Sequence, residues 1–250
     1  MKGLTALAAL AAIPCFASAA TIDLTGTIRD FCNPAITGTC SAHPDFETFF
    51  GDDRGIVQTT LGVDGKPVYA GLAGNPTTTG QTTFDQWFRD TPGVNASTPL
   101  TITLAEGPSG IFTYFSGSFF PIDNQLFGNQ GRGHNYSFTF ELHTDFTYRG
   151  GENFSFTGDD DVWVFINKSL AIDLGGVHGA ESAAVALDTL GLTRGQTYGL
   201  DLFFAERHTV GSDFGFTTEL VLATAVPEPG TLSLLSAGLA GLAWRRRRRR

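Results

Sequence analysis

The fold class is indicated most clearly by the sequence Phe154-Ser155-Phe156-Thr157-Gly158-Asp159-Asp160-Asp161-Val162-Trp163-Val164-Phe165-Ile166. Its first part alternates apolar and polar residues, as a strand does when one of its faces is buried. Its last part, Val162–Ile166, is apolar on both faces, which is typical of a central strand covered on each side. Asn167-Lys168 then predicts a tight turn, with a returning strand at Ser169–Asp173.

The same alternation recurs along the chain and predicts further strands. They are expected at Ile22–Ile28, Leu100–Leu104, Ile111–Phe115, Tyr136–Leu142, Phe146–Tyr148, Tyr198–Phe204 and Phe214–Leu222. Residues Gly51–Pro99 are rich in Gly, Thr, Asn and Pro, and predict long surface loops with a short helix at Phe84–Asp90. Because turn signals fall about ten residues apart, the fold class is all-β, an antiparallel β-sandwich. One domain over 21–225 is expected.

Both ends of the chain are predicted to be targeting segments rather than parts of this domain. Residues 1–20 have the pattern of a signal peptide, with Lys2, an apolar stretch Leu4–Phe16 and small residues before the cleavage site. At the other end, a largely apolar run of fourteen residues, 231–244, precedes six arginines. A helix of that length spans roughly 21 Å. This is short for a bilayer core of about 30 Å, and the arginines stay on the cytoplasmic side.

The tail 226–250 resembles the PEP-CTERM sorting signal of Gram-negative bacteria. The resemblance rests on Pro227-Glu228-Pro229, the apolar run and the terminal arginines, in that order. It implies export, passage through the inner membrane, processing by an exosortase, and a final place in the cell envelope, on the outer surface or in the exopolysaccharide matrix. An ordinary single-span C-terminal anchor is the alternative. Either way the domain lies outside the cytoplasm.

Charge and cysteine content narrow the function further. Between Thr21 and Val226 nine Lys and Arg face twenty-four Asp and Glu, a formal charge of −15. Such a surface repels phosphate backbones, so nucleic acid is not an expected partner. It suits divalent cations and neutral sugars, although solubility alone explains it equally well.

Cys32 and Cys40 are predicted to form a disulfide, as expected in an oxidising compartment.

Asp159, Asp160 and Asp161 form a candidate metal site. Three successive carboxylates between buried strands cost free energy unless a cation or hydrogen-bond donors compensate them. Oxygen ligands without Cys or clustered His favour Ca²⁺ over Zn²⁺ or Cu²⁺. In extended backbone, however, neighbouring side chains point to opposite faces. A cis peptide would bring two of them together. The alternative is that these acids accept backbone N–H bonds in a loop.

Five motifs resemble the fibro-slime domain, which is similar to the protective-antigen-like sugar-binding domain, a jelly-roll β-sandwich of yeast flocculin adhesins. The resemblance covers most of 45–222, and Phe84–Asp90 also matches its middle. The motifs are Phe119–Asp123, His134–Thr139, Gly158–Asn167, Asp173–His178 and Phe203–His208.

In those lectins a cis-linked Asp pair holds Ca²⁺, which bridges to sugar hydroxyls. The resemblance aligns Asp159 and Asp160 with this pair, but Asp161 stands where Gly is usual. The ligand pair therefore stays open between Asp159–Asp160 and Asp160–Asp161, and a third alternative is that Asp161 adds a ligand to the first pair. Further metal or sugar contacts are expected among Asp173, Glu206, Asp213 and Trp87. Trp87 has the alternative of being a residue of a covering loop.

Three functions follow as hypotheses. The first is an exported, non-catalytic, Ca²⁺-dependent carbohydrate-binding or adhesive protein whose partner is an extracellular polysaccharide. The second is a structural protein of the biofilm matrix that uses Ca²⁺ only for stability. The third is a polysaccharide-cleaving enzyme, which needs two carboxyl groups about 5–9.5 Å apart. The sequence names neither the sugar nor the oligomeric state.

Overall fold

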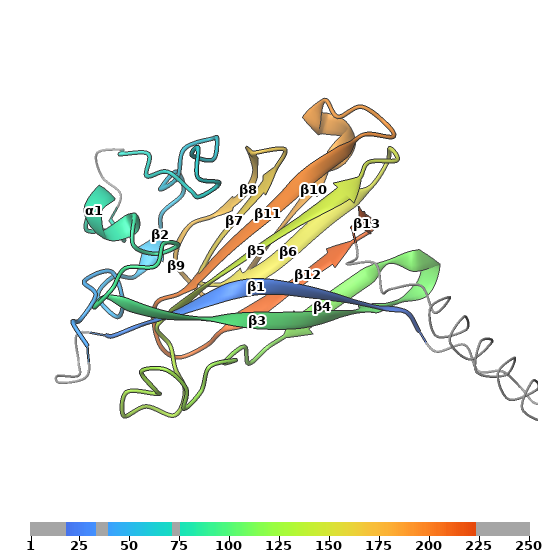
Figure 1. The fold of residues 1–250 in the computed structure, drawn as a ribbon. Helices are drawn as coiled ribbons and strands as arrows, with labels where there is room; N and C mark the ends of the chain where they lie inside the picture. Colours follow the sequence, from blue (N-terminus) through green and yellow to red (C-terminus); the bar gives the residue numbers. More distant parts are fainter. Residues whose placement is uncertain (1–18, 34–39, 72–75, 224–250) are drawn as a thin grey trace, which may run out of the picture.

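The computed structural model describes residues 19–33, 40–71 and 76–223 (Figure 1), and within them the fold is nearly all β. The strands are β1 (Thr21–Phe31), β2 (Gly51–Asp52), β3 (Asn95–Glu106), β4 (Phe112–Ser116), β5 (Phe138–Thr147), β6 (Asn153–Asp159), β7 (Asp161–Ile166), β8 (Ser169–Leu174), β9 (Gly176–Val177), β10 (Glu181–Ala186), β11 (Thr197–Glu206), β12 (Asp213–Thr218) and β13 (Val221–Leu222). Helical turns are confined to α1 (Gln81–Phe84) and two 3₁₀ segments, Pro108–Gly110 and Leu187–Leu190.

Eleven of these strands form one antiparallel sheet that folds back on itself. Its order is β10-β6-β12-β4-β3-β1-β5-β11-β7-β8, with β13 beside β5, while β2 and β9 form a separate pair. The fold brings Phe214 of β12 to 5.2 Å from Phe204 of β11 and 5.6 Å from Phe140 of β5, between ring centroids. The two layers thus enclose one aromatic-rich core, and the predicted antiparallel β-sandwich is confirmed.

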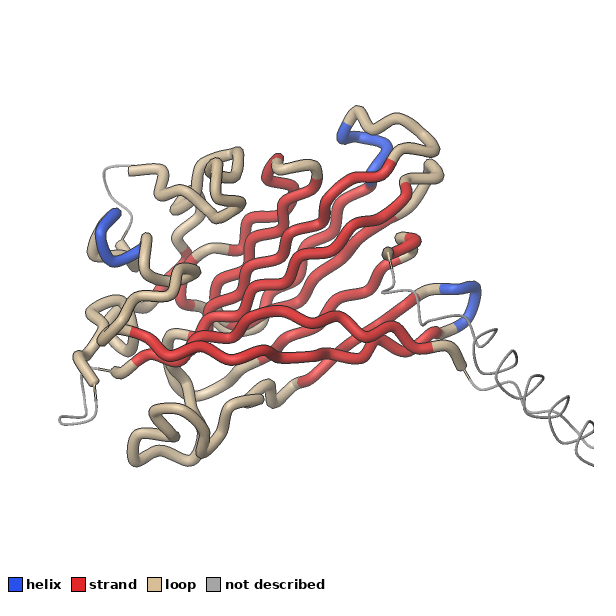
Figure 2. The backbone as a smooth tube through the Cα atoms, viewed as in Figure 1, coloured by secondary structure: helices blue, strands red, loops and turns tan. Residues whose placement is uncertain are grey.

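Strand β7 is buried on both faces, as its apolar sequence predicted. Val162, Val164 and Ile166 belong to the main core between the two layers. Trp163 and Phe165 face a second core, which the segment between β1 and β3 completes with Phe84, Trp87 and other residues. This segment, described at residues 32–33, 40–71 and 76–94, is called the covering segment below. This segment lies beside β7–β9 at one end of the sheet (Figure 1), and Figure 2 shows that most of it is loop. The second core therefore fixes long loops onto the end of the sandwich.

Most predicted strands are present, with several differences. The strands expected at Tyr136–Leu142 and Phe146–Tyr148 are one strand, β5, and the short pair β2 and β9 was not foreseen. The helix expected at Phe84–Asp90 is wrong, because the helix ends at Phe84 and turns follow it. Strand β10 was not foreseen, since its Ala-rich sequence has no strong apolar alternation. The last predicted strand divides into β12 and β13. The turn between β7 and β8 has φ of 51° at Asn167 and 63° at Lys168, as a two-residue hairpin turn requires.

The predicted signal peptide, residues 1–20, lies almost wholly outside the described residues, and the sorting tail, 226–250, lies wholly outside them. The apolar run at 231–244 is part of that tail. In the ranges that are described, no helix combines the length and the apolar character needed to cross a membrane.

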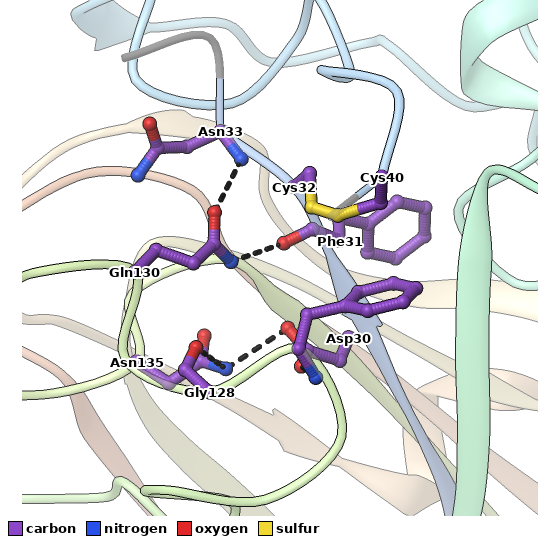
Figure 3. The surroundings of a disulfide bond; sticks show 9 residues. Asp30, Phe31, Cys32, Asn33, Cys40, Gly128, Gln130 and Asn135 are labelled. Carbon is purple, nitrogen blue, oxygen red and sulfur yellow. Dashed lines mark hydrogen bonds between the residues drawn. A yellow bond between two sulfur atoms is a disulfide. The ribbon is translucent and has the colours of Figure 1, made fainter. Parts of the chain in front are cut away.

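The end of β1 is attached to the neighbouring loop by a disulfide and an amide bridge (Figure 3). Cys32 and Cys40 are bonded, with their Cα atoms 5.9 Å apart. The Gln130 side chain accepts a hydrogen bond from the Asn33 N–H at 2.8 Å and donates one to the Phe31 carbonyl at 2.7 Å. Asn135 donates to Asp30 at 2.9 Å. These contacts hold the start of the covering segment against the loop that precedes β5.

A charged cluster lies on the face of β5 that the covering segment occupies. Glu141 is buried and pairs with Arg29 at 2.9 Å and with Lys66 at 2.6 Å. Burial would raise the pKa of Glu141, but hydrogen bonds from His143 and Lys66 and the charge of Arg29 lower it to about 2. Burial would lower the pKa of His143, but Asp201 and Glu141 raise it to about 9.

We expect this cluster to make folding stability fall at alkaline pH. A histidine whose folded-state pKa is raised contributes stability in full below its unfolded pKa of about 6.5. That contribution is lost as pH rises through about 9. Urea unfolding of His143→Gln at several pH values between these limits should show a smaller decline than the unsubstituted protein. Asp201→Asn should lower the folded-state pKa of His143, so that the stability is lost at a lower pH than in the unsubstituted protein. An unchanged decline in both variants contradicts this assignment.

Candidate functional site

A pocket of about 220 Å³ opens at the end of the sandwich where β6 meets β7. Its walls come from that junction, from the segment after β9, from the loop between β11 and β12, and from the covering segment. The lining residues are Phe50, Asp159, Asp160, Val177, His178, Gly179, His208, Thr209, Val210 and Gly211. Because Asp159 and Asp160 line one pocket, the structure brings together two of the three predicted acids.

The peptide bond between Asp159 and Asp160 is cis. Asp160 is buried, and its carboxylate accepts backbone N–H bonds from Arg207 at 2.7 Å and from His178 at 3.2 Å. Asp159 ends β6, directly opposite Asp213 of β12, and is partly exposed. Asp160 is thus fixed by the backbone of two neighbouring loops, whereas Asp159 faces the pocket with fewer restraints.

Asp161 points to the other side, where it pairs with Arg207. The guanidinium donates from Nε to Asp161 Oδ2 at 2.5 Å and from Nη2 to Oδ1 at 3.0 Å. Both side chains are fully buried. Asp161 Oδ1 also accepts the N–H of Gly176 at 2.6 Å. Asp161 is neutralised by this ion pair and does not line the pocket, so it lies outside the candidate cation site. Asp159 and Asp160, which do line the pocket, are therefore the candidate pair.

Arg207 continues from this pair into the covering segment. It donates to the carbonyl oxygens of Thr77 at 2.7 Å and Asp45 at 3.2 Å. Its guanidinium carbon lies 4.4 Å from the centroid of the Trp87 ring. Burial alone would lower the pKa of Arg207, but Asp161 and Asp160 raise it. The charge is therefore kept inside the protein by acids and carbonyl groups on every side.

The acids around the pocket are held close together at a cost in free energy. Burial raises the pKa of Asp160 well above its usual value, opposed by Arg207 and helped by Asp161. Burial and then Asp213 raise the pKa of Asp159. Burial and then Asp160 raise the pKa of Glu206 well above its usual value. A cation in this pocket would favour the charged forms of these carboxylates.

Near these acids, Glu206 and Ser212 each have a buried side-chain oxygen that lacks a hydrogen-bond partner among the described residues. Within the described part of the chain, Glu206 Oε2 and Ser212 Oγ are buried without a hydrogen bond of normal geometry. The Ser212 hydroxyl is nonetheless near enough to oppose the rise in the pKa of Glu206. Buried polar atoms of this kind need partners, and a bound ion or water could supply them.

Two glycines give the pocket its shape. A Cβ at Gly211 would lie 2.8 Å from Asp159 Oδ2, so a larger residue would displace that carboxylate. Gly176 has φ of 119°, and a Cβ there would lie 2.4 Å from the Asp53 nitrogen. The first glycine leaves the Asp159 oxygen accessible, and the second lets the covering segment approach β9.

Of the four residues predicted to make further metal or sugar contacts, two lie near the Asp pair and two do not. Glu206 and Asp213 lie beside the Asp pair, as described above. Asp173 does not, because it accepts hydrogen bonds from Trp163 Nε1 and Gly175 N at 3.0 Å and from Gly55 N at 2.8 Å. Trp87 is fully buried and donates to Asp45 at 3.1 Å. Its ring has no exposed face for a sugar, so its position is that of a covering-segment residue.

Sequence reasoning missed the rim of the pocket. Phe50 is 78% exposed and Val210 is 85% exposed, and both line the opening. Phe50 lies 6.2 Å from the His208 ring. An isolated Phe in a loop carries no signal of such a position. His178 directs Nδ1 at the Gly179 carbonyl at 2.8 Å and Nε2 at the Leu174 carbonyl at 3.1 Å.

The carboxylates around the pocket have the chemistry of ligands for the predicted Ca²⁺. Over residues 19–33, 40–71 and 76–223, no three His, Cys, Asp or Glu side chains are placed to hold a metal ion by themselves. Two carboxylates, an accessible oxygen on Asp159 and an unused oxygen on Glu206 are present. Calcium also takes backbone carbonyls, waters and ligand hydroxyls. The residues therefore fit a Ca²⁺ that the protein only partly encloses, with Asp159 and Asp160 as its side-chain ligands.

Two protein-family models match parts of the chain. The PA14 domain model matches residues 121–228, which include the Asp pair, β11 and β12. The PEP-CTERM protein-sorting motif matches residues 225–249. Both predicted resemblances, to the protective-antigen-like domain and to the sorting signal, are therefore confirmed.

Individual proteins are similar over a larger part of the chain. Protein psiD of Dictyostelium discoideum is 44% identical over 192 residues, which cover 70% of this chain and 38% of psiD. Protein psiC of the same organism is 41% identical over 220 residues, covering 80% of this chain and 41% of psiC. The chain thus spans less than half the length of these curated relatives. Among solved structures, a PA14 sugar-binding domain from an RTX adhesin aligns with 81% of this chain and 96% of that domain, at 11% identity and a TM-score of 0.33.

The Arg207–Asp161 pair should dominate the stability of this end of the molecule. Removing one partner leaves the other charge buried without compensation, which costs about 3–5 kcal/mol. We expect Arg207→Met to lower the free energy of unfolding by that amount in urea titrations. Arg194→Met, at an exposed arginine, should change it by less than about 0.5 kcal/mol. Equal effects of the two substitutions contradict the central place given to Arg207.

Proposed function

We propose that this protein is an exported, non-catalytic carbohydrate-binding or adhesive protein that holds Ca²⁺ at Asp159 and Asp160 and uses it to bind sugar hydroxyls. The observation that carries the proposal is the pocket in which these two carboxylates face the loop 208–211. The match to the PA14 domain supports the sugar-binding part. The fibro-slime motifs noted in the sequence agree with it.

Each pocket residue has a defined part in this proposal. Asp160, fixed by two backbone N–H groups, sets the position of the ion. Asp159 provides the accessible oxygen beside Gly211. The bound Ca²⁺ supplies open coordination positions for neighbouring hydroxyl groups of a sugar. Phe50 and Val210, exposed at the rim, offer apolar contacts to its C–H groups.

The sorting motif supports the location. A PEP-CTERM match at residues 225–249 supports export, handling of the tail by an exosortase-type enzyme, and delivery to the envelope or exopolysaccharide matrix of a Gram-negative bacterium. A membrane segment at 231–244 belongs to the same proposal. A bound polysaccharide would be the expected partner in that place.

A structural matrix protein is the second candidate, and one observation favours it. Asp160 and Glu206 are buried acids with strongly raised pKa values, and a cation there would stabilise the fold without any sugar. A ligand present at about a hundred times its Kd adds roughly 2.7 kcal/mol to folding stability. Stabilisation by Ca²⁺ is therefore common to both candidates, and only sugar retention separates them.

The test is retention of the purified full-length protein on a glycan panel, with Ca²⁺ and with chelator. Retention should occur with Ca²⁺ and be lost with chelator. Asp159→Asn should weaken retention at least tenfold, because a neutral amide replaces a charged ligand to the ion. Asp160→Asn should do the same, provided that thermal unfolding shows it to be folded.

Asp145→Asn is the matched control, because Asp145 is an exposed acid near the far end of β5. It should leave retention unchanged. A melting temperature that falls on chelation, without retention on any glycan, would favour the structural candidate. Release of reducing ends from a polysaccharide would instead require an enzyme and overturn the non-catalytic part of the proposal.

A further inference from the structure

The outer face of β6, β12 and β4 carries small hydroxyl side chains around one exposed aromatic ring. Alternation directs the Phe residues of β6 and β12 into the core, and therefore the residues between them outward. Ser155 and Thr157 of β6, Thr217 of β12, and Thr113 and Phe115 of β4 lie on this outward face. They line a hollow of about 210 Å³ together with Gly215.

Phe115 is the centre of this face. Its side chain is 63% exposed, although it is one of the large apolar residues of the chain. It stands directly opposite Gly215 in the ladder, and a Cβ at Gly215 would lie 2.6 Å from Phe115 Cδ2. The ring thus occupies the space that a side chain at position 215 would need. This gives the sheet an aromatic platform without burying the ring.

The side chains around the platform are hydroxylic and uncharged. Thr113 and Thr217 bring their hydroxyl oxygens to 3.3 Å, and Thr157 and Ser182 bring theirs to 2.7 Å. No residue that lines the hollow is charged, in a domain whose acids far outnumber its bases. A surface of this composition suits a neutral, hydroxyl-rich ligand. A charged peptide or phosphate would find no partner on it.

This face is continuous with the pocket described above. Asp159 is the next outward residue of β6 after Thr157, and Asp213 lies opposite it in β12. Phe115 is level with Thr157, through Gly215, and so lies two residues along the strands and two strands across from Asp159. At about 3.3 Å per residue and about 4.8 Å between neighbouring strands, this separation is about 12 Å. That distance exceeds a single sugar ring. A ligand that fills the pocket with one residue therefore reaches Phe115 only if it is a chain.

We propose that the face around Phe115 is an extension of the glycan site that binds the internal units of a neutral polysaccharide, so that the protein binds a polymer more tightly than its single sugar. This inference rests on the proposed function for the end unit. Phe115 contacts the C–H face of one sugar ring, and the Ser and Thr hydroxyls hydrogen-bond to its neighbours.

The test compares binding of glucose, galactose and mannose with binding of dextran, galactan and mannan, using the full-length protein with Ca²⁺. The sugar that binds should bind more tightly as a polymer. Phe115→Ala should weaken polymer binding by roughly two- to tenfold, the range of a single aromatic contact, and leave single-sugar binding unchanged. Phe115→Trp should retain polymer binding, whereas Phe115→Leu should weaken it as much as Phe115→Ala does.

Val63→Ala is the control, because Val63 is fully exposed in the covering segment, away from this face. It should change neither measurement. If Phe115→Ala leaves the polymer preference intact, the inference is wrong and the pocket proposal stands. If Phe115→Ala alters only the molecular mass seen in light scattering, the face binds a second copy of the chain, and the inference is again wrong. If no sugar binds in any form, the proposed function fails and this extension fails with it.

Discussion

The buried ion pair between Arg207 and Asp161 is the constraint on which the site depends. Arg207 follows the last residue of β11, and Asp161 is the first residue of β7, so the pair joins two neighbouring strands at one end of the sheet. The same guanidinium donates to carbonyl groups of the covering segment and lies on Trp87. The Arg207 guanidinium therefore contacts the sheet, the covering segment and the second core at once. Such an arrangement is worth little as a source of net stability, but it is costly to disrupt.

This pair also divides the acids into those that build the fold and those that face the pocket. Asp161 is neutralised by Arg207 and turned inward. Asp160 receives the N–H of Arg207 itself, so the residue that anchors the fold also positions the pocket. Asp159 remains partly exposed, beside Asp213 and against Gly211. Like charges opposite each other in a sheet are unfavourable, which leaves this corner in need of a cation or of protonation.

The sequence was sufficient to predict the fold class and to single out the acids of the candidate site. Strict alternation in β5, β6 and β11 and the two-sided apolar run of β7 predict a covered antiparallel sheet, because burial sets these patterns directly. The acids at 159–161 were identified because charge beside buried strands needs compensation. The division among them could not be derived from sequence alone, since it depends on a partner forty-six residues away.

Other features depend on long-range packing and left no local signal. Trp87 is buried because Trp163, Arg207 and Asp45 surround it, and all three lie far from position 87 in the sequence. Phe50 and Phe115 are exposed aromatic residues in a chain with twenty-two phenylalanines, and only the structure separates them from those of the core. Gly211 and Gly215 matter for the side chains that they let approach, which a sequence pattern does not reveal.

The most direct test of this account is the location of a bound cation in crystals of the protein grown with Ca²⁺ and then exchanged into a lanthanide. Anomalous scattering should give one strong peak in contact with the carboxylates of Asp159 and Asp160, at the mouth of the pocket beside Gly211. A lanthanide peak only at scattered surface acids, or a pocket that holds water alone at saturating Ca²⁺, would contradict the claim that this pair of acids forms the binding site.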